Sequence, residues 1–591
     1  MKGAINFGTA ICVFLTILLL GASCKKFTVL NSDPNNITVD KASADYLMAG
    51  VLTQSAMWYG NLGSGQLSGA MQQTAQDAWG NTFSQYAWSP MDWSTNYSIL
   101  RDNKFLLVKA QQNGWKFHQG VAMVMRAFNY GNIADFWGDA PDSLALNGDL
   151  DGSENQFPVF DAQDAIYARV IRDLKAAIPF FEGNADDYKE ITSATRSSDV
   201  FYGGDPAKWK RLAYSLLLRY YMRQSSKIDV KADVEAISGE VFQDNGDDFS
   251  MPLPGIDAGT SYQFASKFQS RSGYDRNKMS GTLTMRLKDL QDPRIVIMAE
   301  PIQTPSVVDA SKFAAGDNTT LVNLENGIRY INPAAAAASH FKQFNPATYS
   351  TDRPYGAVLS SVWGLYDTSS RYVGVPISYS NNDFSYNING TGTQSTSINN
   401  YVSYLRKDIY DNPSGPLLVQ KLASYTEICF DLAEAALKGW NVKGGTAEDW
   451  YNRGIQASFD DWQVFAKYQS DVDGYSGCVK SYSSYIAQPS VAFNNTLQRI
   501  IEQKWIASWQ ACNEAFMDWR RTGYPALTIG WASYRQQIPL RFAYHNTEIQ
   551  NNTDNANKAI SKLETTPYVG PDGANSCWSK FWLLQGTGKP W

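Results

Sequence analysis

The chain has 591 residues and a formal charge of −6 at pH 7, and 44% of its residues are apolar. This supplies enough apolar material for a large core, while a mean hydropathy of −0.34 is typical of a globular body that faces water. Because the acidic charge is mild and not gathered into runs, the composition argues against a nucleic-acid partner.

The first 23 residues have the layout of a secretory signal peptide. Lys2 gives a positive start, residues 10–20 are apolar, and Gly21, Ala22 and Ser23 are small residues directly before Cys24. This arrangement resembles a bacterial lipobox, which implies a lipid on Cys24 and stable attachment to a membrane. A cleaved soluble protein and an uncleaved transmembrane anchor are the alternatives.

Five helices are predicted from the spacing of apolar residues, at 116–136, 162–182, 206–224, 417–438 and 497–519. Asp161 is the predicted N-cap of the second helix. Asp205, followed by Pro206, is the capping residue of the third. Cys429 and Cys512 lie on apolar helix faces and are predicted to be buried thiols.

Residues 225–414 are rich in Gly, Ser, Asn and Thr and show only weak strand signals, as at 371–378. Segments this long without regular structure are usually functional or disordered. We therefore expect residues 1–23 to be the signal peptide, 24–40 a lipidated tether and 41–591 one domain. Its helical scaffold would cover about 41–224 and 415–550, and an irregular ligand lobe about 225–414.

Short motifs follow one another through the mature chain. They are Asn-Ser-Asp-Pro-Asn at 31–35, Arg-Ala-Phe-Asn-Tyr at 126–130, Phe-Trp-Gly-Asp-Ala-Pro at 136–141, Asp-Pro-Arg at 292–294, Ala-Glu-Ala-Ala at 433–436, Glu-Gln-Lys-Trp at 502–505, Arg-Arg-Thr-Gly-Tyr-Pro at 520–525 and Ile-Pro-Leu-Arg-Phe at 538–542. Together, in this order, they resemble the SusD/RagB family of outer-membrane nutrient-binding lipoproteins.

The resemblance implies a mainly α fold, with tetratricopeptide-like helix pairs that carry a large irregular lobe. It also implies a partner, a SusC-like TonB-dependent outer-membrane transporter over which the lipoprotein acts as a lid. One departure concerns export: Lys25, Lys26 and Phe27 follow Cys24, without the acidic pair often associated with the outer face. An exterior position at the outer membrane therefore follows mainly from the family.

Signals for catalysis are poor. The chain has no G-x-S-x-G, P-loop or H-E-x-x-H motif and only three histidines, so a multi-histidine metal site is not expected. Asp149, Asp151 and Glu154 resemble part of a calcium loop, but the pattern is incomplete and a solvated loop is favoured. We predict no cofactor, with a structural calcium ion left open.

The aromatic residues divide into core and candidate ligand contacts. Apolar helical spacing assigns Trp209, Trp505, Trp509 and Trp519 to the core, whereas Arg520 and Arg521 are expected to fix a helix end. Rings outside helical stripes can stack on the apolar face of a pyranose. The candidate ligand contacts in two such regions are Trp79, Tyr86, Trp88 and Trp93, and Trp363, Tyr366, Phe384 and Tyr386.

These observations predict a non-catalytic surface lipoprotein that binds an oligosaccharide and delivers it to the transporter. Peptide binding, as the RagB side of the family would imply, is the first alternative. A surface glycoside hydrolase is the second, and it would need two carboxylates about 5–10 Å apart. The sequence identifies no such pair.

Overall fold

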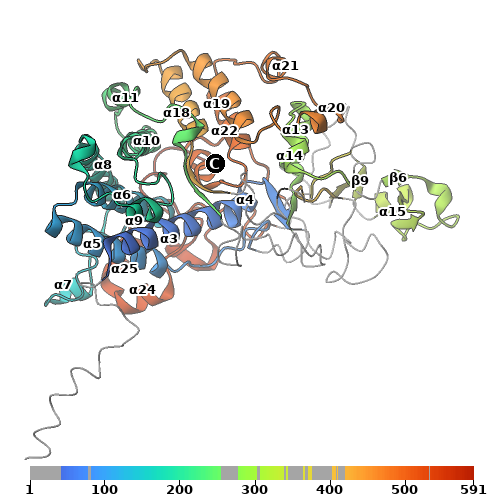
Figure 1. The fold of residues 1–591 in the computed structure, drawn as a ribbon. Helices are drawn as coiled ribbons and strands as arrows, with labels where there is room; N and C mark the ends of the chain where they lie inside the picture. The colour runs from blue at the N-terminus through green and yellow to red at the C-terminus, as the bar shows by residue number, and fades with distance from the viewer. Residues whose placement is uncertain are drawn as a thin grey trace, which may run out of the picture.

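The structure is a computed structural model that describes residues 42–76, 82–253, 277–302, 306–338, 341–343, 364–366, 371–375, 402–406, 409, 419–530 and 533–591. Helices dominate these residues and strands are short, as the mainly α fold class requires. Figure 1 shows α3, α5, α6, α8 and α10 at one end and β6 and α15 at the other. Among the described residues no helix is long and apolar enough to cross a membrane.

The N-terminal half of the scaffold is a succession of packed helices. They are α3 (Ala44–Ser64), α5 (Ser94–Asn113), α6 (Lys116–Trp137), α8 (Gln163–Ala177) and α10 (Pro206–Gln224). Contacts run from α3 to α5, from α5 to α6, from α6 to α8 and from α8 to α10. Each helix thus covers the apolar face of its neighbour, as expected for helix pairs in a solenoid-like stack.

The predictions for 116–136 and 206–224 are confirmed by α6 and α10. The carboxylate of Asp205 accepts hydrogen bonds from the backbone N–H groups of Ala207 and Lys208, and Pro206 occupies the first helical position. This start is set locally because the capping acceptor and the proline are adjacent in the sequence.

The predicted cap of α8 is wrong. Ala162 is the N-cap, and Asp161 instead accepts hydrogen bonds from the backbone N–H groups of Asp142 and Ser143. Asp139, from the preceding turn, accepts the N–H of Gln163 at 2.9 Å. The capping carboxylate therefore comes from an earlier segment, which sequence proximity does not reveal.

The predicted helix 417–438 begins too early. Residues Val419–Ala423 form strand β11, which pairs antiparallel with β4 (Phe249–Pro252). Helix α18 (Tyr425–Leu437) starts only after Ser424, whose hydroxyl accepts the N–H of Glu427. Gly439 has a φ of 77°, a conformation that suits glycine at the end of a helix.

The predicted helix 497–519 is two helices, α22 (Leu497–Ala507) and α23 (Asn513–Thr522). The chain turns between them, and the backbone N–H of Cys512 donates to the carbonyl of Gly63 in α3. Apolar residues continue across the break because the turn is packed against the core. Helix α19 (Ala447–Asp461) packs on α18 and was not predicted.

The remaining elements are short. The helices are α4 (Gln66–Ala70), α7 (Ser153–Gln156), α9 (Ser193–Ser198), α11 (Lys231–Ile237), α13 (Gly281–Asp289), α14 (Ile295–Met298), α15 (Pro333–Ala338), α20 (Gln469–Asp473), α21 (Tyr482–Ile486), α24 (Asn546–Asn551) and α25 (Thr553–Ile560). Turns of 3-10 helix are η2 (Ile178–Phe181), η3 (Ala185–Asp187), η4 (Asn245–Asp247), η5 (Ala310–Lys312) and η7 (Gly570–Asn575).

The strands form small separate sheets. Strand β1 (Thr74–Gln76) pairs with β5 (Asn277–Met279), β2 (Ala140–Pro141) with β3 (Phe160–Asp161), and β9 (Phe341–Gln343) with β10 (Gly364–Tyr366). A three-stranded sheet has the order β6 (Ser306–Val308), β8 (Ile328–Ile331) and β7 (Val322–Glu325). Of the strand expected near 371–378, residues 371–375 are described and contain one bridge, between Val375 and Ser280, while residues 376–378 lie outside the described residues.

The predictions for the core are confirmed. Trp209, Trp505, Trp509 and Trp519 are all buried. The four described cysteines, Cys429, Cys478, Cys512 and Cys577, are buried free thiols. Burial raises the pKa of Cys577 to about 11, so this thiol stays protonated and unreactive near neutral pH.

Candidate functional site

Three of the rings predicted to contact ligand are core residues. Tyr86, Trp88 and Trp93 are at most 5% exposed. The ring of Trp88 lies 5.7 Å from that of Phe516 and 5.2 Å from that of Phe542. Because Phe516 and Phe542 both belong to the scaffold, Trp88 has no open face for a sugar. The burial of Tyr86, Trp88 and Trp93 contradicts the prediction that these rings contact ligand. The sequence places them in a loop, but the loop folds onto the core.

The other predicted contacts lie elsewhere. Trp79, Trp363, Phe384 and Tyr386 are outside the described residues, and Tyr366 is described only as a backbone position in β10. These five rings remain predictions.

An exposed aromatic that the sequence analysis missed lies directly beside the first predicted region. Tyr534 is 54% exposed, and its backbone N–H donates to the carbonyl of Gln85 at 2.8 Å. Its ring rests on Trp578, which is fully buried, with ring centroids 6.0 Å apart. Trp578 therefore covers only part of the Tyr534 ring, and the residue stays half exposed.

Polar groups flank this ring. The guanidinium carbon of Arg535 lies 4.5 Å from the centre of the Tyr534 ring. Arg535 Nη2 donates to Asp572 Oδ2 at 3.1 Å, and the Asp572 side chain is 45% exposed. The hydroxyl of Ser533 is buried and has no hydrogen-bond partner among the described residues. We call Tyr534, Arg535 and Asp572 the Tyr534 surface.

A ring that is 54% exposed, beside an exposed carboxylate, has two elements of a carbohydrate-binding platform. The part of the ring that Arg535 leaves open supplies an apolar face, and the Asp572 carboxylate can accept hydrogen bonds from sugar hydroxyls. The signal available in the sequence was an aromatic–arginine pair in the irregular segment between Gly523 and Ile538.

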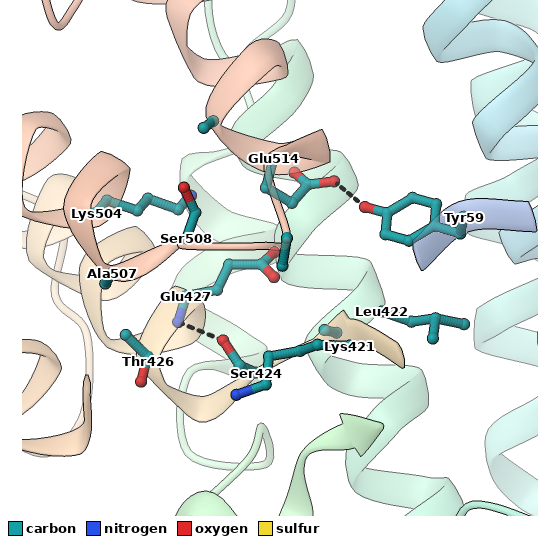
Figure 2. Close-up of a pocket in the computed structure, with 13 residues that line it drawn as sticks. Tyr59, Lys421, Leu422, Ser424, Thr426, Glu427, Lys504, Ala507, Ser508 and Glu514 are labelled. Carbon is teal, nitrogen blue, oxygen red and sulfur yellow. Dashed lines mark hydrogen bonds between the residues drawn. The ribbon is translucent and has the colours of Figure 1, made fainter. Parts of the chain in front are cut away.

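The cavity in the scaffold is a different kind of site. It lies between β11, the start of α18, and α22 and α23, and Figure 2 shows Tyr59, Glu427, Lys504 and Glu514 lining it. Its volume is about 30 Å³, which at about 10–15 Å³ for each water molecule leaves room for about two ordered waters. An oligosaccharide chain needs a longer, more open site.

Ion pairs surround the cavity. Arg219 donates to both carboxylate oxygens of Glu427 at 2.7 Å, and the hydroxyl of Tyr59 donates to Glu514 at 3.0 Å. Burial by itself would raise the pKa of Glu514, but Arg219 and Arg223 outweigh it and hold that pKa below its usual value. Glu427 and Glu514 are thus paired with arginine and link helices, and the lowered pKa of Glu514 is the opposite of what a general acid in glycoside hydrolysis needs.

A second set of ion pairs ties α18 to α22 and α23. Lys504 donates to Asp431 at 2.6 Å, and Arg521 donates to both oxygens of Glu434 at 2.6 Å. Arg520 donates to the backbone carbonyls of Leu540 and Asp135. The prediction that Arg520 and Arg521 fix a helix end is confirmed.

The part of the chain that the structure describes contains no group of three or more His, Cys, Asp or Glu side chains suited to a metal ion. Asp149, Asp151 and Glu154 are exposed and do not gather into such a group. The calcium loop considered from the sequence therefore lacks a ligand cluster.

Two family profiles match the chain. Residues 34–342 match a SusD-like profile described as starch-binding and associating with the outer membrane, and residues 387–582 match the SusD and RagB outer membrane lipoprotein profile. The chain belongs to the SusD/RagB family. Members of this family are nutrient-binding, non-catalytic lipoproteins of the outer membrane. The match confirms the protein class and the outer-membrane location that the motifs implied.

Solved SusD-like structures share the fold. A SusD homologue from Bacteroides fragilis is 19% identical with a TM-score of 0.66, covering 92% of this chain and 100% of its own. A SusD/RagB family protein from Bacteroides thetaiotaomicron is 19% identical with a TM-score of 0.61, covering 92% and 99%. A chitin-binding SusD homologue from Flavobacterium johnsoniae is 18% identical with a TM-score of 0.60, covering 91% and 99%. No curated protein matches the chain.

Proposed function

We propose that this SusD-like protein binds an oligosaccharide at the Tyr534 surface and delivers it to a TonB-dependent outer-membrane transporter. The observation that carries the proposal is Tyr534, an aromatic ring 54% exposed beside the Arg535–Asp572 pair. Such a ring can stack on the apolar face of a sugar, and the exposed carboxylate of Asp572 can accept hydrogen bonds from its hydroxyls.

Family descriptions give the ligand class its support. One matched profile is described as starch-binding and one relative as chitin-binding, so glucans and chitin oligosaccharides are the first ligands to test. The lipid on Cys24 and the exterior position of the protein belong to the same proposal. Trp79, Trp363, Tyr366, Phe384 and Tyr386 remain proposed additional ligand contacts.

The test is calorimetric titration of soluble protein starting at Lys25 with oligosaccharides and peptides, followed by chromatography of the ligand. We expect saturable heat with an intact oligosaccharide. Saturable binding of peptides alone would assign the protein to the RagB-like alternative. Sustained heat with cleaved ligand would contradict a non-catalytic role.

A matched pair of tyrosine variants locates the site. Tyr534→Ala should weaken binding about tenfold, since a lost stacking contact costs on the order of 1 kcal/mol or more. Tyr46, 77% exposed on the first turn of α3, supplies the control. Equal affinities for the Tyr534→Ala and Tyr46→Ala variants would remove Tyr534 from the site.

A further inference from the structure

Two buried residues close to the Tyr534 surface have a backbone conformation that is uncommon outside glycine. Gln72, just after α4, has a φ of 55°, and Tyr86 has a φ of 62°. Both residues are 0% exposed. A left-handed conformation is unfavourable for a residue with a side chain, and it persists only where the surrounding contacts hold it. The contacts of Gln72 and Tyr86 therefore show what this part of the fold maintains.

The carboxamide of Gln72 connects three segments. Its Nε2 group donates to the hydroxyl of Tyr86 at 3.0 Å and to the carbonyl of Thr528 at 2.7 Å. Its Oε1 atom accepts a hydrogen bond from the hydroxyl of Thr282 at 2.8 Å. A carboxamide carries two N–H donors and an acceptor on one planar group. Gln72 uses all three, which a carboxylate or an apolar side chain of similar length cannot do.

The left-handed conformation of Tyr86 sets the direction of a carbonyl that holds Tyr534. The carbonyl of Gln85 lies in the planar peptide group that joins Gln85 to Tyr86. The φ of Tyr86 therefore fixes how this carbonyl is turned relative to the buried Tyr86 ring. The Gln85 carbonyl accepts the backbone N–H of Tyr534 at 2.8 Å. Because the Tyr86 hydroxyl is bonded to Gln72, the carboxamide helps to aim this carbonyl at Tyr534.

Thr528 gives Gln72 a second link to the same surface. Thr528 precedes Tyr534 by six residues, in the irregular segment that follows α23. Gln72 thus holds this segment at Thr528 and holds the segment against which it packs at Tyr86. Both ends of the contact are fixed before a ligand arrives. A preorganised surface loses less conformational entropy on binding than one that must be ordered.

The third bond of the carboxamide reaches α13. Thr282 lies in the first turn of α13, and Ser280 is the N-cap of this helix. The hydroxyl of Ser280 donates to the backbone carbonyl of Gln72, and its N–H donates to the carbonyl of Gln73 at 3.2 Å. Gln72 therefore lies where the end of α4, the Tyr534 segment and α13 meet.

Gln163 shows the same side chain in a purely structural setting. It is 0% exposed in the first turn of α8. Its Nε2 group donates to the carbonyl of Ala134 at 2.7 Å, and its Oε1 atom accepts the N–H of Leu583 at 3.0 Å. Gln163 thus satisfies buried backbone groups of the scaffold, without a hydrogen bond to the segments that carry Tyr86 and Tyr534. It provides a matched control for Gln72.

We propose that Gln72 is a positioning residue for the Tyr534 surface. Its carboxamide holds Tyr86 in the left-handed conformation, and the Gln85 carbonyl that is aimed in this way holds the backbone of Tyr534. Gln72 is buried and touches no ligand itself. The proposal rests on the proposed function, because Gln72 acts on binding through Tyr534.

The first experiment compares Gln72→Met with Gln163→Met, which both remove the hydrogen bonds and keep a side chain of similar length. Calorimetric titration of the full-length protein, purified in detergent, uses maltohexaose and chitohexaose as probes. We expect Gln72→Met to weaken binding at least fivefold and Gln163→Met to change it less than twofold, although both should lower the urea midpoint. Equal affinities of the two variants would overturn the proposal. Tyr86→Phe, which loses only the hydroxyl, tests the same link if Gln72→Met does not fold, and should weaken binding about threefold.

A double-mutant cycle asks whether the effect passes through Tyr534. In a protein that already carries Tyr534→Ala, Gln72→Met should cause no further loss of affinity, because the ring that it positions is gone. A general loss of structure would instead weaken binding further. Additive losses would therefore overturn the positioning role.

Hydrogen exchange separates failure of this proposal from failure of the proposed function. The amide of Tyr534, followed by mass spectrometry, should exchange at least tenfold faster in Gln72→Met than in Gln163→Met under conditions where both variants are folded. Unchanged exchange would overturn the positioning role even if the affinity falls. If exchange rises while Tyr534→Ala binds both probes as the parent protein does, Tyr534 is not the ligand site, but Gln72 still positions its backbone.

Discussion

The same chemical pair, an arginine and a carboxylate, occurs in two very different settings. Arg219 and Glu427 are both buried among helices, whereas Asp572, which pairs with Arg535 beside Tyr534, is half exposed. In the first setting every charge must be matched, because an unpaired charge in the core is very costly. In the second, water screens the pair, and the exposed carboxylate of Asp572 can take another partner. Burial, and not residue type, separates a structural clamp from a binding surface.

The largest expected effect breaks the buried clamp. Glu514→Gln should lower the free energy of unfolding by about 3–5 kcal/mol, because Arg219 and Arg223 lose a compensating charge. Urea denaturation measures the change. The control is Glu182→Gln, whose partner Lys210 lies at 2.8 Å on the surface. If Glu514→Gln lowers the free energy of unfolding no more than the control does, Glu514 does not hold the helices together.

The next prediction contrasts a buried ring with an exposed one. Trp88→Ala should destabilise the protein by about 3–5 kcal/mol, since it leaves a cavity between Phe516 and Phe542. Tyr534→Ala should change the unfolding free energy by less than about 0.5 kcal/mol while it weakens ligand binding. Thermal and urea unfolding compare the two variants. The contrast fails if Trp88→Ala is as stable as the parent protein.

The pH dependence should separate two buried carboxylates. Burial raises the pKa of Asp142 to about 6, although Arg169 opposes the rise. Because the folded state holds this proton more tightly than the unfolded chain, its contribution to stability falls as pH rises from about 4 to about 6. Glu514, whose pKa is lowered in the fold, has the opposite sign: its contribution is lost as pH falls.

Asp142→Asn removes the first of these titrations. The unfolding free energy of this variant minus that of the parent protein should increase as pH rises from about 4 to about 7. The increase should be at most about 3 kcal/mol, because the pKa is shifted by about two units. Urea unfolding of both proteins at the two pH values measures the difference. A difference that stays constant with pH would contradict a raised pKa for Asp142.

Among the charged side chains, the smallest effect on stability is expected for the exposed Asp572. Asp572→Asn should change the unfolding free energy by no more than about 1 kcal/mol, yet weaken oligosaccharide binding several-fold through loss of a charged acceptor. Asp187→Asn is the control, because Asp187 pairs with Lys116 at 3.1 Å on the surface of the scaffold. If both variants bind as the parent does, Asp572 has no part in the site.

Local patterns in the sequence determined the parts of the fold that depend on neighbouring residues. Helix α10 was predicted with its cap because Asp205 and Pro206 adjoin its first turn. Helix α6 and the buried tryptophans followed from apolar spacing. The short motifs, taken in order, were sufficient to identify the family, and the profile matches show the same family independently. For the helices the deciding signal lies within a few residues, and for the family it lies in the order of short motifs along the chain.

Tertiary structure decided the rest, because the deciding partners are far away in the chain. Residues 419–423 form a strand only because β4, some 170 residues earlier, pairs with them. Trp88 and Tyr534 are both aromatic residues outside regular helices, and one is buried while the other is exposed because of how their segments fold over the scaffold. Exposure is a property of the whole packing, so the sequence alone could predict that rings bind a ligand but not which ones face it.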